Sequence, residues 1–243
     1  MIDLAQMRLL VSVTSAAEAA AALSGGADVI DAKDPRRGAL GAVSPETLRA
    51  IHAVVDPGRL VTAALGDARD DATIEQDARV FTAAGAALIK VGFAGISDAQ
   101  RIGGLIAAAV RGATAGGGGV VAVAYADAAG AASLAPGALI NVAARTGAAG
   151  LLVDTAEKGG PGLRALVPQR ELAAWVAEAR AGGLFVALAG QLTAGDLPFV
   201  HAAGAAIAGV RGAACDGGRT GRVSAERVRR LRAICEELNG GKL

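Results

Sequence analysis

Residues 28–42 read DVIDAKDPRRGALGA, an apolar run flanked by acids that gives way to proline, arginine and glycine. A β-branched apolar run that ends in turn residues is typical of a buried strand opening into a loop. Lys33 stands where this run ends, two residues after Asp31, so both side chains leave the same face of the strand. The stretch therefore predicts a strand over residues 28–33 whose end presents an acid and an amine side by side.

Lysine is used sparingly in this chain. Of the 24 basic residues, twenty are arginines and only four are lysines, namely Lys33, Lys90, Lys158 and Lys242. Lys90 interrupts the apolar run of residues 88–92. A buried amine can lose its proton, whereas a guanidinium cannot. The pattern therefore indicates that the lysines at strand ends serve a chemical purpose.

The alternation of an apolar run with a helical segment repeats along the whole chain. Strands are predicted over residues 8–13, 28–33, 60–65, 88–93, 120–126, 150–155, 185–190 and 207–211. Helices are predicted over 15–25, 45–55, 71–84, 97–111, 136–146, 168–181, 194–203 and 224–238. Eight such pairs without a linker predict an α/β fold, with residues 1–243 forming one (β/α)8 TIM-barrel domain. The competing doubly wound sheet is disfavoured, because no G-x-G-x-x-G follows the first strand.

Polar residues before the apolar periodicity mark several helix starts. Ser44 and Ser224 stand at N-cap positions, and Ser97 with Gln100 three residues later has the capping-box spacing. Gly116 to Gly119 are predicted to connect a helix to the next strand, at the opposite end of the barrel from the strand C-termini.

Composition excludes several classes of protein. Hydrophobic residues make up 53% of the chain but aromatic residues only 2%, which fits strands covered by helices on both faces. A net charge of +1 with few aromatics argues against nucleic-acid binding. The longest apolar runs are of strand length, far short of the roughly 20 residues of a membrane span. The N-terminus lacks a signal-peptide pattern, and two cysteines make neither a disulfide framework nor a metal site. We expect a cytoplasmic protein.

In a barrel of this kind, the C-terminal ends of the strands form the rim that carries the active site. The residues predicted to converge there are Asp31, Lys33, Lys90, Asp154 and Lys158. Each has an alternative interpretation without catalysis. Lys33 can be solvated or ion-paired, Lys90 can form a structural pair with Asp31 or Asp154, and Lys158 can be a loop charge. Asp67, Tyr125 and Asp127 also lie on the predicted rim, without an assigned role.

Two further strand ends indicate a ligand. Gly190 and Gln191 follow the seventh strand, and Arg211, Gly212 and Ala213 follow the eighth. Backbone amides at these two strand ends commonly bind phosphate in barrels, and the side chain of Arg211 or Arg219 is expected to add charge there. This predicts a small phosphorylated substrate. A second amine lowers the pKa of the first and makes it nucleophilic toward a carbonyl. The lysines and the phosphate site together indicate Schiff-base chemistry on a sugar phosphate.

Six segments resemble one known family. They are residues 28–41 (DVIDAKDPRRGALG), 88–92 (LIKVG), 125–127 (YAD), 152–156 (LVDTA), 187–190 (ALAG) and 210–215 (VRGAAC). They are similar to (5-formylfuran-3-yl)methyl phosphate synthase, also called 4-(hydroxymethyl)-2-furancarboxaldehyde-phosphate synthase, of methanofuran biosynthesis. The resemblance covers nearly the whole chain, from the first strand to the eighth. It departs after Lys158, where Gly159 to Gly162 replace a more lysine-rich loop.

The resemblance implies a carbon–oxygen lyase that condenses two molecules of glyceraldehyde 3-phosphate, with loss of one phosphate and two waters and without a metal or cofactor. It implies that Lys33 forms the Schiff base and that Lys90 is the proton acceptor. Asp31, Asp154 and Lys158 are then supporting groups. A class I aldolase for another small sugar phosphate, and a barrel that only binds a phosphorylated ligand or a protein, are the alternatives. The alanine-rich helices are compatible with a homo-oligomer.

Overall fold

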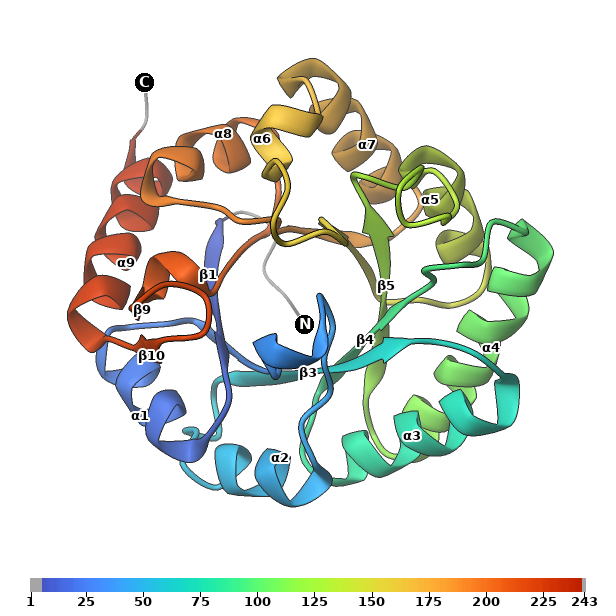
Figure 1. Ribbon diagram of the computed structural model, residues 1–243, viewed down its shortest axis with the longest axis horizontal. Helices are drawn as coiled ribbons and strands as arrows, with labels where there is room; N and C mark the ends of the chain where they lie inside the picture. The colour runs from blue at the N-terminus through green and yellow to red at the C-terminus, as the bar shows by residue number, and fades with distance from the viewer. Residues whose placement is uncertain (1–5, 242–243) are drawn as a thin grey trace.

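The computed structural model describes residues 6–241, which form a closed barrel of parallel strands inside a ring of helices (Figure 1). The barrel strands are β1 (Arg8–Val13), β2 (Val29–Ala32), β3 (Leu60–Asp67), β4 (Leu88–Gly92), β5 (Gly119–Tyr125), β6 (Gly150–Asp154), β7 (Phe185–Leu188) and β8 (Ile207–Val210). Each strand pairs with the next, and β1 pairs with β8 to close the barrel. The predicted (β/α)8 architecture is confirmed.

Helices cover the outer face of every strand. They are α1 (Ala16–Ser24), α2 (Pro45–His52), α3 (Asp71–Ala83), α4 (Ala99–Ala115), α5 (Pro136–Arg145), α6 (Leu163–Leu166), α7 (Gln169–Ala181), α8 (Leu197–Ala202) and α9 (Ala225–Gly240). Short 3-10 turns, η1 (Pro35–Arg37), η2 (Ala194–Asp196) and η3 (Gly212–Ala214), follow β2, β7 and β8. A small antiparallel pair, β9 (Cys215–Asp216) and β10 (Arg222–Val223), precedes α9. Nowhere in residues 6–241 is a helix long and apolar enough to span a membrane.

The helix caps follow the sequence with one correction. Ser44 accepts a hydrogen bond from the backbone N–H of Thr47, as an N-cap does. The predicted capping box at Ser97 is wrong, because α4 begins after Asp98, whose carboxylate accepts from the N–H of Arg101 at 2.6 Å. A carboxylate at this position also interacts favourably with the helix dipole. Ser224 stands at the N-cap of α9, but its side chain forms no capping hydrogen bond.

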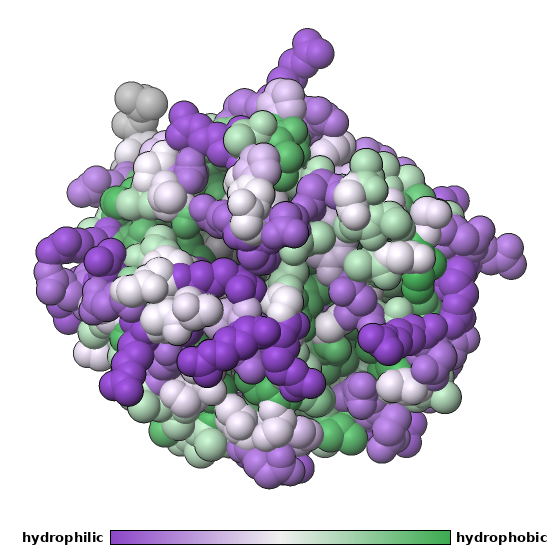
Figure 2. All heavy atoms as spheres, viewed as in Figure 1, coloured by the Kyte–Doolittle hydropathy of each residue, from purple (hydrophilic) through white to green (hydrophobic). Residues whose placement is uncertain are grey.

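Two loops meet over the mouth of the barrel. The η1 turn lies over the centre of the ring in the view of Figure 1. Arg219, from the loop between β9 and β10, donates hydrogen bonds to the carbonyl oxygens of Pro35, the first residue of this turn, and Gly38, which follows it. Figure 2 shows hydrophilic residues gathered across the middle of the same face. The rim predicted to hold the active site is therefore polar and partly covered.

Candidate active site

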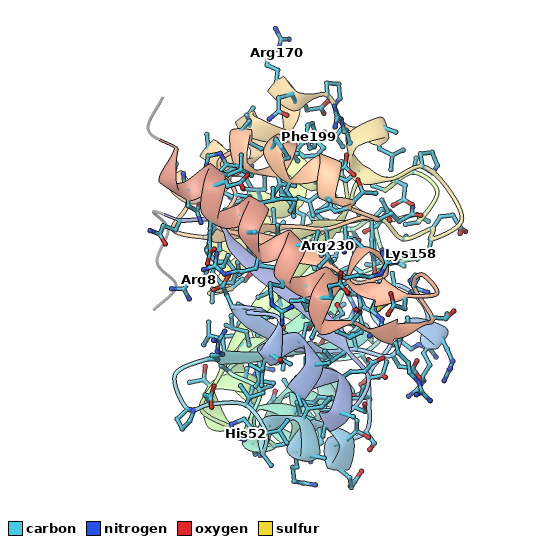
Figure 3. All side chains as sticks on the ribbon, turned by 90° about the vertical axis from the view of Figure 1, so that its left-hand side faces the viewer. Arg8, His52, Lys158, Arg170, Phe199 and Arg230 are labelled. Atoms are coloured by element: carbon cyan, nitrogen blue, oxygen red, sulfur yellow. The ribbon has the colours of Figure 1, made fainter. Side chains whose placement is uncertain are left out.

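A cavity of about 270 Å³ opens at the rim and extends down inside the barrel. Every residue predicted as catalytic or phosphate-binding lines it: Asp31, Lys33, Lys90, Asp154, Lys158, Gly190, Gln191, Arg211, Gly212 and Ala213. The side view of Figure 3 places Lys158 at the end of the barrel opposite Arg8, where β1 begins. The topology thus brings together groups from β2, β4, β6, β7 and β8.

Lys33 follows β2 directly and points its amine into this cavity, with only 8% of the residue exposed. Among residues 6–241, no carboxylate lies within ion-pair distance of its Nζ. Burial, together with the charges of Lys90 and Lys158, lowers the pKa of Lys33 to about 8 against the opposing effect of Asp154 and Asp31. A fraction of this amine is therefore neutral and nucleophilic near neutral pH.

Lys90 is held by Asp31 on the neighbouring side of the barrel interior. Its Nζ lies 2.6 Å from Asp31 Oδ2, and both side chains are buried. Ser12 donates a hydrogen bond to Oδ2 and Thr62 donates one to Oδ1, each at 2.8 Å. Burial alone would raise the pKa of Asp31, but the charges of Lys90 and Lys33 and these hydrogen bonds lower it below the usual value. Asp31 is thus an anion that fixes Lys90 beside Lys33.

Asp154 and Lys158 form a second pair across the cavity. Lys158 Nζ donates to Asp154 Oδ1 at 2.7 Å and to Thr155 Oγ1 at 3.2 Å, so Lys158 is not a free loop charge. The other oxygen, Asp154 Oδ2, is buried and has no hydrogen-bond partner within the described part of the chain. Because buried oxygens are normally paired, this one is positioned to accept a hydrogen bond from a ligand.

The ends of β7 and β8 present backbone amides. The N–H groups of Gly190, Gln191, Gly212 and Ala213 form no hydrogen bond with residues 6–241. Gly190 and Gln191 both have positive φ, 104° and 57°, which turns the chain sharply after β7. The side chain of Gln191 donates to the carbonyl oxygens of Gly160 and Pro161. Its contribution to an anion site therefore comes from its backbone amide.

Arg211 lines the cavity, but the structure argues against the phosphate contact predicted for its side chain. Its guanidinium binds both carboxylate oxygens of Glu18, at 2.6 and 3.1 Å. Further donations reach the carbonyl oxygens of Ser12, Arg219 and Gly221. An arginine has five N–H donors, and these contacts occupy all five. Arg211 therefore joins the ends of β1 and β8, and its partner Glu18 was missed because it stands inside an alanine-rich helix.

Comparison with known proteins shows the family to which this barrel belongs. Residues 9–232 match the family model described as 4-HFC-P synthase. The chain belongs to the 4-HFC-P synthase family. It is 37% identical over 235 residues to (5-formylfuran-3-yl)methyl phosphate synthase of Methanocaldococcus jannaschii, covering 95% of this chain and 100% of the relative. The protein of the same name from Methanopyrus kandleri is 39% identical, covering 92% and 97%.

The solved structures agree with the fold of this 4-HFC-P synthase family member. A crystal structure of 3-hexulose-6-phosphate synthase superimposes with a TM-score of 0.63 at 26% sequence identity, covering 94% of this chain and 99% of the other. The match to the family model and the named relatives confirm the family resemblance drawn from six sequence segments and the assignment to an enzyme family.

Three further rim residues of the 4-HFC-P synthase barrel have structural contacts. Tyr125 donates to Asp67 Oδ1 at 2.6 Å, and burial together with Asp67 raises the pKa of this phenol. Asp127 accepts from the N–H groups of Ala156 and Glu157, at 2.8 and 2.9 Å. It therefore shapes the loop that carries Lys158.

Gly92 offers a test of the Tyr125–Asp67 contact. A Cβ at this position would collide with Asp67 Oδ1 and Tyr125 Oη, so we expect Gly92→Ala to lower the free energy of unfolding by about 1–3 kcal/mol. Urea denaturation measures the change. Gly104→Ala in α4 is the control, because a Cβ there meets nothing within 4 Å. An unchanged stability of Gly92→Ala would contradict the close packing of this cluster.

Proposed function

We propose that this chain condenses two molecules of glyceraldehyde 3-phosphate into (5-formylfuran-3-yl)methyl phosphate, with loss of one phosphate and two waters. The reaction would supply the furan of a methanofuran-type cofactor in the cytoplasm. The names of the relatives support the product. The observation that carries the chemistry is the buried amine of Lys33, which lines the cavity without an ion-pair partner among the described residues.

Lys33 is proposed as the Schiff-base residue. Its neutral amine adds to the aldehyde carbon of one substrate molecule, and loss of water gives an iminium ion. This cation draws electrons from the adjacent carbon, so the C–H proton there can leave and an enamine forms. The enamine can attack the aldehyde of the second molecule, or its electron pair can expel a phosphate from the next carbon. One covalent intermediate therefore supports both carbon–carbon bond formation and phosphate loss.

The proton transfers are proposed to use the two lysine–aspartate pairs. Lys90 is the proposed proton acceptor, and Asp31 at 2.6 Å fixes its position in the cavity wall. Its ammonium first gives a proton to the hydroxyl that leaves as water, and the neutral amine then accepts the C–H proton. Asp154 offers its free Oδ2 to a substrate hydroxyl, while Lys158 and the N–H of Thr155 hold Oδ1. General acid–base groups must lie within hydrogen-bond reach of the reacting atoms, which a fixed pair provides.

The phosphate of the substrate is proposed to bind at the ends of β7 and β8. The unpaired amides of Gly190, Gln191, Gly212 and Ala213 supply donors without a charged side chain. The 3-hexulose-6-phosphate synthase that shares this fold carries a sugar phosphate in its name.

Product analysis tests the proposed function. The purified protein is incubated with glyceraldehyde 3-phosphate, and the products are identified by mass spectrometry with released phosphate measured in parallel. We expect one phosphate for every two substrate molecules consumed and a furan aldehyde phosphate as the product. A class I aldolase would instead give an aldol adduct that retains both phosphates. That outcome would overturn the furan synthesis while keeping the Schiff base.

The rate is expected to rise with pH through about 8. The free amine is the reactive form, and the lowered pKa of Lys33 places its formation in this range. For a lysine with the ordinary pKa of about 10.4, the rate would rise at a pH about two units higher. The pH profile of kcat/KM at limiting substrate measures it. A profile that is flat between pH 6 and about 9 would contradict the role of this amine.

A further inference from the structure

The interior of the barrel is not filled evenly. Ala187 keeps 6% of its surface exposed, whereas its neighbours Val186 and Leu188 on the outer face of β7 keep 1% and 0%. Leu152 on β6 shows the same contrast, and both residues line the cavity. Elsewhere in the interior, Val29 on β2 and Val123 on β5, which pairs with Leu152, are fully buried. The cavity therefore extends downward beside β6, β7 and β8.

Small residues make this space. Ala187 on β7, Ala189 just after β7 and Gly209 on β8 line it, below the amides of Gly190 and Gly212. We call the lower part of the cavity beside β1, β6, β7 and β8 the apolar well; it is lined by Leu10, Leu152, Phe185, Ala187, Ile207 and Gly209. Barrel interiors are normally packed by bulky side chains, and an empty apolar space costs stability. Its presence directly under a phosphate-binding end indicates a bound group.

The chemistry of the well excludes a polyol. A hydroxyl placed against these six residues would lose its hydrogen bonds to water and gain no side-chain partner from them. A flat, weakly polar ring has no hydroxyl group, so its burial in the well leaves no hydrogen-bond donor without a partner. The relatives are named for (5-formylfuran-3-yl)methyl phosphate, in which one methylene joins a furan ring to the phosphate. A phosphate held at the ends of β7 and β8 would place that ring against Ala189, Ala187 and Gly209 below it.

We propose that the apolar well binds the furan ring of the product and of the dehydrated intermediates that precede it. This inference rests on the proposed function and adds a selective step to it. The linear substrate carries hydroxyls that the well does not satisfy, so the well binds each species better as water is lost. Such preference for later species favours the dehydration and cyclisation steps over release of a linear adduct.

Binding to the wild-type protein tests the well without turnover. Furan-3-ylmethyl phosphate and glycerol 3-phosphate both carry the phosphate and lack a carbonyl, so neither forms a Schiff base. We expect calorimetry to show the furan compound binding about tenfold tighter or more. Equal or tighter binding of glycerol 3-phosphate would overturn the proposal that the apolar well binds the furan ring. A protein that prefers the furan compound but yields no furan product from glyceraldehyde 3-phosphate would keep the well and refute the proposed function.

Gly209→Ala narrows the well without a clash. A Cβ there would lie 3.4 Å from Ala189 Cβ and 3.6 Å from Leu10 Cδ2, which is ordinary contact. We expect at least about a fivefold loss of affinity for furan-3-ylmethyl phosphate with an unchanged affinity for glycerol 3-phosphate. Gly103→Ala in α4 is the matched control, with contacts of 3.6 and 3.7 Å outside the cavity. An equal loss for both ligands, or no loss, would overturn the proposal; if the variant does not fold, the wild-type comparison decides.

Discussion

Lys33→Arg is expected to lower kcat by roughly 10⁴-fold or more, because arginine keeps the charge and cannot form a Schiff base. The side chain lines the cavity and has no ion-pair partner within residues 6–241 that would give it a structural task. The initial rate of phosphate release from glyceraldehyde 3-phosphate measures the effect. A rate within tenfold of the wild type would remove Lys33 from the mechanism.

Lys33→Met is the companion variant that separates catalysis from folding. The pKa of Lys33 is lower in the folded protein than in the unfolded chain, so its charged form destabilises the fold at pH values below about 8. As the pH rises above the unfolded value, the amine is neutral in both states and this penalty disappears. We therefore expect Lys33→Met to be inactive but to have a higher melting temperature than the wild type at pH 6. This difference in melting temperature should shrink at alkaline pH. A lower melting temperature at pH 6 would contradict a net destabilising effect of burying this amine.

Arg211→Met is expected to lower the free energy of unfolding by about 3–5 kcal/mol, because it leaves Glu18 buried without its counter-ion. Both oxygens of Glu18 accept from Arg211, and Thr14 and Val223 bind the same carboxylate. Burial would raise the pKa of Glu18, but Arg211 and Thr14 together lower it. In a chain of this length, the melting temperature should fall by roughly 10 °C.

Arg111→Met controls for the loss of an ion pair in general. Arg111 pairs with Glu75 at 2.7 Å, but its side chain is 58% exposed, so we expect a change of less than about 1 kcal/mol. Thermal denaturation of both variants gives the comparison. Similarly small losses of stability in Arg211→Met and Arg111→Met would contradict the structural role of Arg211. They would instead favour the predicted role of Arg211 in phosphate binding.

Strand positions could be predicted closely from the sequence because each barrel strand is a short apolar run bounded by turn residues. β1 has the predicted bounds, Arg8–Val13, and the other strands differ at their ends by one or two residues. The α6 helix was missed because the four residues Leu163–Leu166 are too few to show a helical period. The N-cap of α4 is Asp98 and not the predicted Ser97. Both residue types suit an N-cap position, and the sequence alone does not rank them.

The candidate site could be predicted as a set of residues but not as a set of contacts. Barrel topology alone places Lys33, Lys90 and Lys158 at one rim. The pairing of Lys90 with Asp31, and not with Asp154, depends on the stagger of the strands, which periodicity does not encode. Glu18 and Arg211 are 193 residues apart, and only the closure of β8 against β1 brings them together. The one-domain organisation, the cytoplasmic location, the metal-free and cofactor-free reaction and the homo-oligomer stay predictions.

Borohydride trapping tests the central claim most directly. The wild-type protein is incubated with glyceraldehyde 3-phosphate, reduced with sodium borohydride, digested and mapped by mass spectrometry, beside Lys33→Arg. We expect a reduced three-carbon or condensed adduct on Lys33 of the wild type and none on the variant. An adduct on Lys90 or Lys158 in a protein that turns over, or turnover with no adduct at all, would contradict the covalent role of Lys33.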